Sequence, residues 1–339
     1  MPIDPSWLAR IPEPNPDAIV DPGLRELVYT GLRQLEGLQL DELSRGFVWS
    51  MLAGQESAQL AAINARYPFV ARISLGFVEP NIDRADPGLA VIVHICPPVS
   101  PFGPDDWQGS LGYLPAGEIF IENGPARTAF PVVPRVSLQD PQVALSSPSK
   151  AMLTAWMKIR RSTAPKEGWL LPFHAVRQTY GAAPGLSVSY DDNSTGTVID
   201  SLGNCIDAVV ASSSHPPPHA QPCNADNVLP LGLTVTVTDQ NGAAWSPTLM
   251  DVDVNIGLIG YQKAPIRLTY DWSTSAPGDS GALISHGTTG APVAMHQGTS
   301  WIRDLSGVQQ WDSQGNPICR AFGICLFQVA HQLDGEFYL

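Results

Sequence analysis

The chain has 339 residues, of which 44% are hydrophobic and 15% charged, so it holds enough apolar side chains for the core of one large domain or two smaller ones. Its 32 acidic and 19 basic residues give a formal net charge of -13. This balance argues against nucleic-acid binding, because phosphate recognition needs clustered Lys and Arg. The densest basic run, residues 158–161, is predicted to be a solvated strand end.

Neither secretion nor a membrane span is predicted. Residues 1–5 lack a basic n-region followed by an apolar h-region, and no run of about 18 apolar residues occurs. The five cysteines are scattered and match no zinc spacing. We therefore expect free thiols in a reducing, cytoplasmic environment, with no metal or other cofactor and no membrane partner.

Residues 1–134 are predicted to form a small α+β domain. Asp21 is a plausible N-cap with Pro22 at the first helical position, and helical apolar spacing continues over about residues 22–66. Strand-like patterns follow over about residues 69–122. This region contains no recognisable catalytic constellation, so we expect it to recruit a partner protein or to regulate the rest of the chain.

Residues 135–339 read as short strands separated by Gly, Pro, Asn and Asp, a density that predicts a β-sandwich or a pair of barrels. The expected strands are 152–159, 168–171, 186–190, 208–211, 233–238, 252–259, 266–270, 282–284, 291–295 and 324–329. The predicted fold class is therefore mainly β.

The strongest chemical signal is the run Gly278, Asp279, Ser280 and Gly281, followed by an apolar strand. A serine nucleophile has to sit on a tight turn with its hydroxyl exposed. Neighbouring glycines let backbone N–H groups point to one spot, where an oxyanion would form. The structural alternative is an ordinary Gly-Asp turn between two strands.

A serine nucleophile needs a base, and the base needs an acid that orients it. Among seven histidines, His174 follows an apolar segment and precedes the serine; its alternative is a histidine satisfied in the core. Asp207 begins an apolar strand, where a buried carboxylate is costly unless it is paired. The other acids between His174 and Ser280 lie in polar stretches that read as solvated turns. His174 and Asp207 are thus the predicted base and acid.

The order His174, Asp207, Ser280, with Gly-Asp-Ser-Gly at the serine, resembles the trypsin-like (chymotrypsin-fold) serine peptidases, in particular their compact bacterial branch. The resemblance covers about residues 135–339. It implies a chymotrypsin-like double β-barrel preceded by the α+β domain. It also implies a serine endopeptidase that acts on protein or peptide substrates through an acyl-enzyme, with Gly278 and Ser280 N–H groups as the oxyanion hole.

The chain departs from this family in two places. Pro172 and Phe173 stand where a small pair usually precedes the histidine, so we expect a differently bent histidine loop. The zymogen-activated branch also needs a cleavage segment directly before the first barrel, and the sequence shows none there. Activity is therefore expected to be constitutive or governed by the N-terminal domain.

The resemblance also suggests a substrate preference. Relatives that cut after Lys or Arg have an acid six residues before the serine, where this chain has Thr274. His296 lies on a strand that resembles the wall of the first specificity pocket, where relatives that cut after Glu or Gln have a histidine. Thr274 or Ser275 could assist His296 as a second hydrogen-bond donor to a carboxylate or carboxamide.

Three alternatives remain open. The chain could be a catalytically inert binding or scaffold protein with this fold, or an esterase that uses the same triad. A metal site formed by His215, His219 and Cys223 is a further candidate, but polyproline between the histidines does not put them on one face, so a surface loop is favoured.

Overall fold

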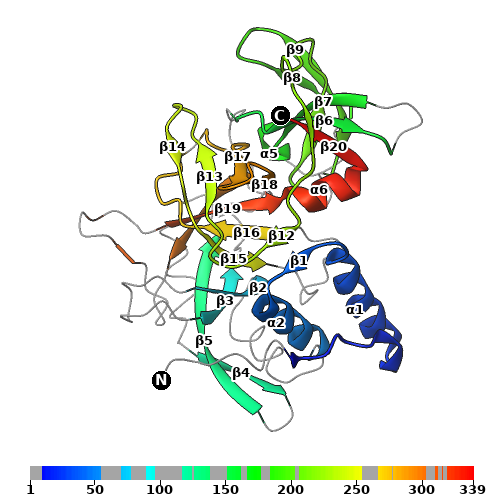
Figure 1. The fold of residues 1–339 in the computed structure, drawn as a ribbon, viewed down its shortest axis with the longest axis vertical. Helices are drawn as coiled ribbons and strands as arrows, with labels where there is room; N and C mark the ends of the chain where they lie inside the picture. Colours follow the sequence, from blue (N-terminus) through cyan, green and yellow to red (C-terminus); the bar gives the residue numbers. More distant parts are fainter. Residues whose placement is uncertain are drawn as a thin grey trace.

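The structure is a computed structural model. It describes residues 10–54, 70–77, 89–95, 117–123, 126–137, 151–161, 166–176, 184–202, 206–253, 266–276, 278–302, 310–311, 315 and 319–339. These residues form a mainly β structure with few helices, in agreement with the predicted fold class. Helices α1 and α2 lie at one end of the molecule and the β8–β9 hairpin at the other (Figure 1). No helix within the described ranges is long and apolar enough to cross a membrane.

The smaller sheet has seven strands in the order β11-β20-β6-β7-β10-β9-β8. They are β6 (Ala155–Ile159), β7 (Lys166–Leu171), β8 (Ser187–Ser189), β9 (Thr195–Ser201), β10 (Val209–Ala211), β11 (Pro222–Cys223) and β20 (Gly335–Tyr338). The short helix α5 (Phe173–Val176) follows β7 directly. In this order β20 lies beside β6 and pairs with it, although the two strands are far apart in the sequence.

The larger sheet has eleven strands in the order β14-β13-β17-β18-β19-β16-β15-β2-β3-β5-β4. They are β2 (Val70–Phe77), β3 (Leu89–Ile95), β4 (Gly117–Asn123), β5 (Ala126–Ser137), β13 (Val235–Thr238), β14 (Ala244–Trp245), β15 (Leu249–Asp253), β16 (Arg267–Tyr270), β17 (Leu283–His286), β18 (Pro292–Ile302) and β19 (Cys319–Cys325). The far end of β18 also pairs with β5. These pairings do not establish a closed barrel, so the expected double β-barrel stays a prediction.

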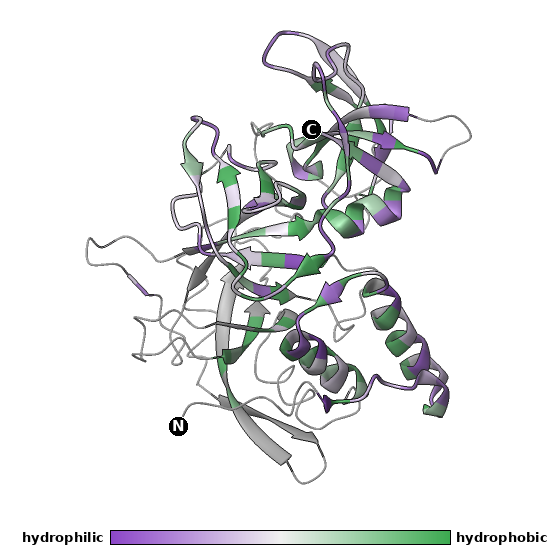
Figure 2. Cartoon of the chain, viewed as in Figure 1, coloured by the Kyte–Doolittle hydropathy of each residue, from purple (hydrophilic) through white to green (hydrophobic). Residues whose placement is uncertain are grey.

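The N-terminal helices cover part of the larger sheet. They are the 3-10 turn η2 (Pro16–Ala18), α1 (Pro22–Gln34) and α2 (Glu42–Ala53), and α1 begins as predicted, with the Asp21 carboxylate accepting the Leu24 N–H at 2.7 Å. Hydrophobic and hydrophilic residues both occur along the two helices (Figure 2). Their apolar side chains, such as Val28 and Phe47, share a core with Ile73 and Val91 of the sheet. The helical pattern predicted beyond residue 54 lies outside the described residues.

The N-terminal part is also joined to the rest of the chain by backbone pairing. Strand β1 (Gln39–Leu40) runs parallel to β12 (Val228–Leu229), and β15 pairs with β2 at Asp251 and Gly76. The expected domain boundary at residues 134 and 135 falls inside β5. The division into two domains stays a prediction.

The prediction of a strand over residues 324–329 is wrong in its second half. Residues 324–329 were expected to be extended, but β19 ends at Cys325 and helix α6 (Leu326–Leu333) begins there. Leu326, Val329 and Leu333 are buried at helical spacing. The apolar run of residues 324–329 therefore belongs partly to β19 and partly to α6. The other expected strands overlap observed ones, although residues 254–259 lie outside the described ranges.

The two sheets share a core. Met157, Leu170 and Val210 of the smaller sheet pack in one cluster with Met295 of the larger sheet and Val329 of α6. Burial of each such side chain contributes about 1.5–3 kcal/mol, so this cluster holds the sheets in a fixed relation.

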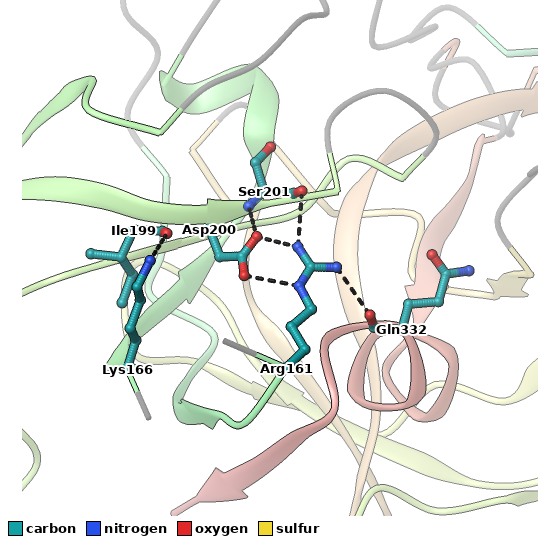
Figure 3. Close-up of polar contacts among 6 residues, drawn as sticks. All are labelled: Arg161, Lys166, Ile199, Asp200, Ser201 and Gln332. Atoms are coloured by element: carbon teal, nitrogen blue, oxygen red, sulfur yellow. Dashed lines mark hydrogen bonds and ion pairs between the residues drawn. The ribbon is translucent and has the colours of Figure 1, made fainter. Parts of the chain in front are cut away.

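Polar contacts at the rim join strands of the smaller sheet to one another and to α6 (Figure 3). Arg161 forms a two-point ion pair with Asp200 and donates to the Gln332 carbonyl at 3.0 Å, which ties the end of β6 to β9 and α6. Arg160 pairs with Glu336 of β20 at 2.6 Å. Arg160 and Arg161, in the basic run predicted to be a solvated strand end, are thus exposed but engaged in ion pairs, whereas Ile159 is buried.

Candidate active site

His174 and Asp207 meet at one edge of the smaller sheet. β7 and β10 are antiparallel neighbours, with Leu171 opposite Val209, so the end of β7 lies beside the start of β10. His174 comes just after β7 and Asp207 just before β10. The Asp207 carboxylate accepts from His174 Nδ1 at 2.5 Å and from the His174 backbone N–H at 2.8 Å. The expected pairing of these two residues is therefore present in the geometry.

The environment of this pair favours the charged form of the His174 imidazole. Asp207 is 3% exposed and the His174 side chain 12%. Burial lowers the pKa of His174, but the charge of Asp207 and its hydrogen bond outweigh burial, so the pKa of His174 is raised above 6.5. Because Asp207 holds Nδ1–H, the imidazole nitrogen left to act as a base is Nε2.

Ser280 lies on a tight turn at the start of β17 in the larger sheet. The flanking glycines have positive φ, +107° at Gly278 and +90° at Gly281. A Cβ on Gly281 would lie 2.0 Å from the Met152 carbonyl oxygen, so only glycine fits there. The Met152 N–H donates to the Ser280 carbonyl at 2.7 Å, which fixes this turn against the segment that enters β6.

The backbone N–H groups of the turn come next. Among the described residues, no backbone carbonyl accepts from the N–H groups of Gly278 or Ser280. The Ser280 hydroxyl donates to the Gln297 carbonyl at 3.3 Å, and it makes no hydrogen bond to His174 within the described part of the chain. Such catalytic hydrogen bonds are often long in the absence of substrate and shorten when substrate binds.

His296 lies in a buried polar cluster on the other side of the turn. It is 1% exposed; the Tyr270 hydroxyl contacts its Nδ1 at 2.6 Å and the Ser275 hydroxyl its Nε2 at 2.7 Å. The Trp272 ring packs 4.8 Å away. Burial, and next the charge of His174, lower the pKa of His296 to about 3, so it is neutral at physiological pH.

Of the three residues expected to bind substrate, the structure brings two together. Ser275 and His296 are hydrogen-bonded, whereas Thr274 is exposed and makes no hydrogen bond to His296 in the described structure. With one proton on the imidazole, Tyr270 can donate to Nδ1 while Nε2–H points to Ser275. Ser275 is only partly buried, so a ligand that reaches it also comes close to Nε2 of His296.

Sequence reasoning missed two residues of this site, Tyr270 and Gln297. The Gln297 amide donates to the Asp207 carboxylate at 2.8 Å, while its backbone carbonyl accepts from Ser280. The pairing of β18 with β19 shifts between His296 and Gly298, so Gln297 is the extra residue of a β-bulge. A bulge re-aims side chains, which lets consecutive residues both turn inward. No sequence pattern indicates this bulge.

Metal-binding clusters are absent from the described residues: no three His, Cys, Asp or Glu side chains come together there as a metal would need. His215, from the loop considered as a metal site, instead lies 3.2 Å from the Asp192 carboxylate, and both are exposed.

Comparisons with known proteins give limited similarity. No model of a known protein family matches the sequence. No curated protein matches it either. A solved Glu endopeptidase in complex with MPD is similar over 57% of this chain and 96% of its own, with 12% identity and a TM-score of 0.26. The tobacco vein mottling virus protease is similar over 58% of this chain and 86% of its own, with 12% identity and a TM-score of 0.25. At TM-scores this low, a similarity does not establish a shared activity.

Proposed function

We propose that this protein is a serine endopeptidase with Ser280 as nucleophile, His174 as base and Asp207 as the acid that orients it. The observation that carries the proposal is the His174–Asp207 pair, joined by two hydrogen bonds and linked through Gln297 to a glycine-flanked serine turn. A histidine with only a structural role would not need one buried carboxylate that accepts from both its backbone N–H and its ring Nδ1–H.

The chemistry follows from this arrangement. Nε2 of His174 takes the Ser280 proton as Oγ attacks the substrate carbonyl, and the resulting oxyanion accepts from the N–H groups of Gly278 and Ser280. His174 then gives its proton to the leaving amine, which breaks the peptide bond and leaves an acyl-enzyme. Water, deprotonated by the same imidazole, hydrolyses the acyl-enzyme and returns the proton to Ser280.

We further propose that the enzyme prefers Gln, and less strongly Glu, before the cleaved bond. His296 and Ser275 offer a neutral donor pair, because the pKa of His296 is lowered to about 3. A neutral imidazole can donate to a carboxamide without a charge change. A carboxylate would enter a buried site without a cation from His296, which costs free energy.

The test is covalent labelling by a fluorophosphonate probe, with the adduct located by mass spectrometry. We expect labelling at Ser280 in the intact protein and none in Ser280→Ala or His174→Ala. Ser275→Ala is the matched control: it removes a nearby hydroxyl whose neighbouring imidazole, His296, is too weak a base to activate it because its pKa is lowered to about 3, so this variant should still be labelled at Ser280. Absence of labelling in the intact protein contradicts the proposal. Peptides with Gln, Glu, Lys or Leu before the cleaved bond then test the preference.

Two other functions are separated by the same reagents. A scaffold protein with this fold would bind partners but neither react with the probe nor hydrolyse substrates. An esterase would be labelled and would hydrolyse esters but not peptides. The buried, doubly bonded His174 favours an active hydrolase over a scaffold, since an inert protein gains nothing from holding an imidazole in one tautomer.

The N-terminal part is proposed to recruit a partner protein. Helices α1 and α2 lie at the far end of the molecule from the β8–β9 hairpin of the smaller sheet (Figure 1). Substitutions on the solvent face of α1, such as Arg33→Glu, should change partner capture but leave peptide hydrolysis unchanged. Loss of hydrolysis in this variant would contradict the recruiting role.

A further inference from the structure

A second carboxylate is buried beside the proposed nucleophile. Asp279 is 2% exposed, and the proposed mechanism gives it no role. A buried carboxylate is unfavourable unless hydrogen bonds compensate for the lost water. Asp279 accepts the Ala276 N–H at 2.7 Å and the Gln240 N–H at 3.0 Å. One of its two backbone partners thus belongs to its own loop, and the other to a distant turn.

That distant turn connects β13 to β14 and is itself strongly held. The Asp239 carboxylate accepts the N–H groups of Asn241 (2.8 Å) and Ala243 (2.9 Å) and the Trp245 indole N–H (3.1 Å). These hydrogen bonds, led by the one from Ala243, lower the pKa of Asp239, so it stays ionised well into the acid range. β13 also pairs with β17, the strand that follows Ser280. The turn is therefore fixed to the same sheet as the nucleophile.

The Gln240 side chain in this turn also contacts the loop that carries Gly278 and Ser280. A Cβ on Gly278 would lie 2.2 Å from Gln240 Oε1, so the Gln240 side chain lies directly against the Gly278 α-carbon. Gly278 carries one of the two proposed oxyanion donors, and its φ of +107° is a conformation that few residues adopt. Gln240 therefore touches the loop twice, through its N–H at Asp279 and through its side chain at Gly278.

We propose that the Asp239–Gln240 turn positions the oxyanion loop: Asp239 orders the turn, and Gln240 holds Asp279 and covers Gly278, so that the Gly278 and Ser280 N–H groups converge on one point. Asp239 and Gln240 are positioning residues and do not touch substrate. This inference rests on the proposed peptidase function. It adds that the geometry of the oxyanion hole is fixed from outside the loop that carries Gly278 and Ser280, by the β13–β14 hairpin at the edge of the larger sheet.

The variant Asp239→Ala tests the proposal in the full-length protein. Misplacing an oxyanion donor weakens transition-state binding more than substrate binding, so kcat should fall about tenfold or more with KM nearly unchanged. A peptide aldehyde, whose adduct with Ser280 places an oxyanion in the same hole, should bind weaker by the same factor. The acid limb of the pH profile, which reports His174, should not move.

Three further variants sharpen this test. Asp239→Asn keeps an acceptor for the two backbone N–H groups and should recover most of the activity. Gln240→Ala keeps the backbone N–H that donates to Asp279 but removes the side chain that covers Gly278. Its kcat and aldehyde affinity should therefore lie between those of the intact protein and those of Asp239→Ala. Asp192→Ala is the matched control: its carboxylate likewise accepts the N–H of a residue two positions on, Ser194, but in the turn between β8 and β9 of the other sheet. It should leave kcat and aldehyde affinity unchanged.

Hydrogen exchange at residues 276–282 separates this inference from the proposed function. Faster exchange there in Asp239→Ala, and not in Asp192→Ala, supports the positioning role whether or not the protein hydrolyses peptides. If the intact protein is active and Asp239→Ala keeps its kcat and aldehyde affinity, the inference is wrong and the proposed function stands. If no form is active, the proposed function fails, and unchanged exchange overturns the inference as well.

Discussion

His174 and His296 are both largely shielded from solvent, yet their pKa values are shifted in opposite directions because their partners differ. His174 has a carboxylate at 2.5 Å, which raises its pKa despite burial. His296 has two hydroxyls, from Tyr270 and Ser275, and burial with the nearby charge of His174 lowers its pKa to about 3. Burial alone therefore does not decide the state of a histidine. The partner does: a carboxylate raises the pKa of one imidazole, whereas two hydroxyls leave the other neutral.

The largest expected effect comes from removing the charged partner. In Asp207→Asn, kcat should fall by about 10⁴, because the imidazole loses both its orientation and the stabilisation of its charged form. Since the base must be neutral, activity of the intact enzyme should fall as pH drops through a value above 6.5. In Asp207→Asn only burial remains, so this limb should move below 6.5.

Rates measured from pH 5 to pH 9 check this prediction. The stability effect has a related sign: a raised His174 pKa stabilises the folded protein fully below 6.5, and this contribution is lost as pH rises through the folded-state pKa. An acid limb that stays in place in Asp207→Asn would mean that another group sets it.

The next effect concerns the neutral histidine. His296→Leu should lower kcat/KM for peptides with Gln before the cleaved bond on the order of 100-fold, because a buried donor is lost to a substrate that needs one. Labelling of Ser280 by the fluorophosphonate should remain. His331→Gln, an exposed histidine on α6, is the control.

The ratio of Gln to Glu cleavage gives a second reading of His296. Because the pKa of His296 is about 3, this ratio should stay constant from pH 5 to 9 while the rates themselves titrate with His174. A ratio that shifts toward Glu between pH 7 and 5 would show that His296 becomes charged in that range.

A smaller effect is expected at Gln297. Gln297→Met removes the amide that donates to Asp207 and keeps a similar volume. The carboxylate then carries more of its charge toward His174, so the acid limb should move to higher pH, and kcat should fall about tenfold. A loss of kcat with no movement of the limb would indicate a packing role instead.

The smallest effect is expected at Tyr270. Tyr270→Phe leaves Nδ1 of His296 without its partner, so the preference for Gln should weaken a few-fold and unfolding should become easier by about 1–2 kcal/mol. Tyr190→Phe, which removes a hydroxyl bonded to the Ser212 carbonyl at 2.9 Å, should cost similar stability and leave the preference intact. Thermal unfolding and peptide profiling separate the two results.

The parts of the site that the sequence predicted depend on local chemistry. A glycine-flanked serine, a histidine after an apolar run and an acid before one are each visible within ten residues. Gln297 and Tyr270 depend on how strands pair, which a sequence does not display: Gln297 turns inward only because β18 bulges against β19. Thr274 was a reasonable partner for His296 by distance along the chain, but the turn points Ser275 there instead.

The fold shows the same division. Asp21 was recognisable as a helix start because capping acts within one turn. The parallel pair of β1 with β12 could not be foreseen, since two residues joined to a segment almost 190 positions away leave no pattern. The start of α6 was missed because Leu326 and Val329 suit a buried strand as well as a helix face.

The pairing of β20 with β6 has a consequence for folding. The sheet that carries His174 and Asp207 joins residues 155–159 to residues 335–338. Contacts of such long sequence separation form late and slowly, because the loop between them must close first. We therefore expect this pairing, and with it the full sheet around His174 and Asp207, to form late when the unfolded protein refolds.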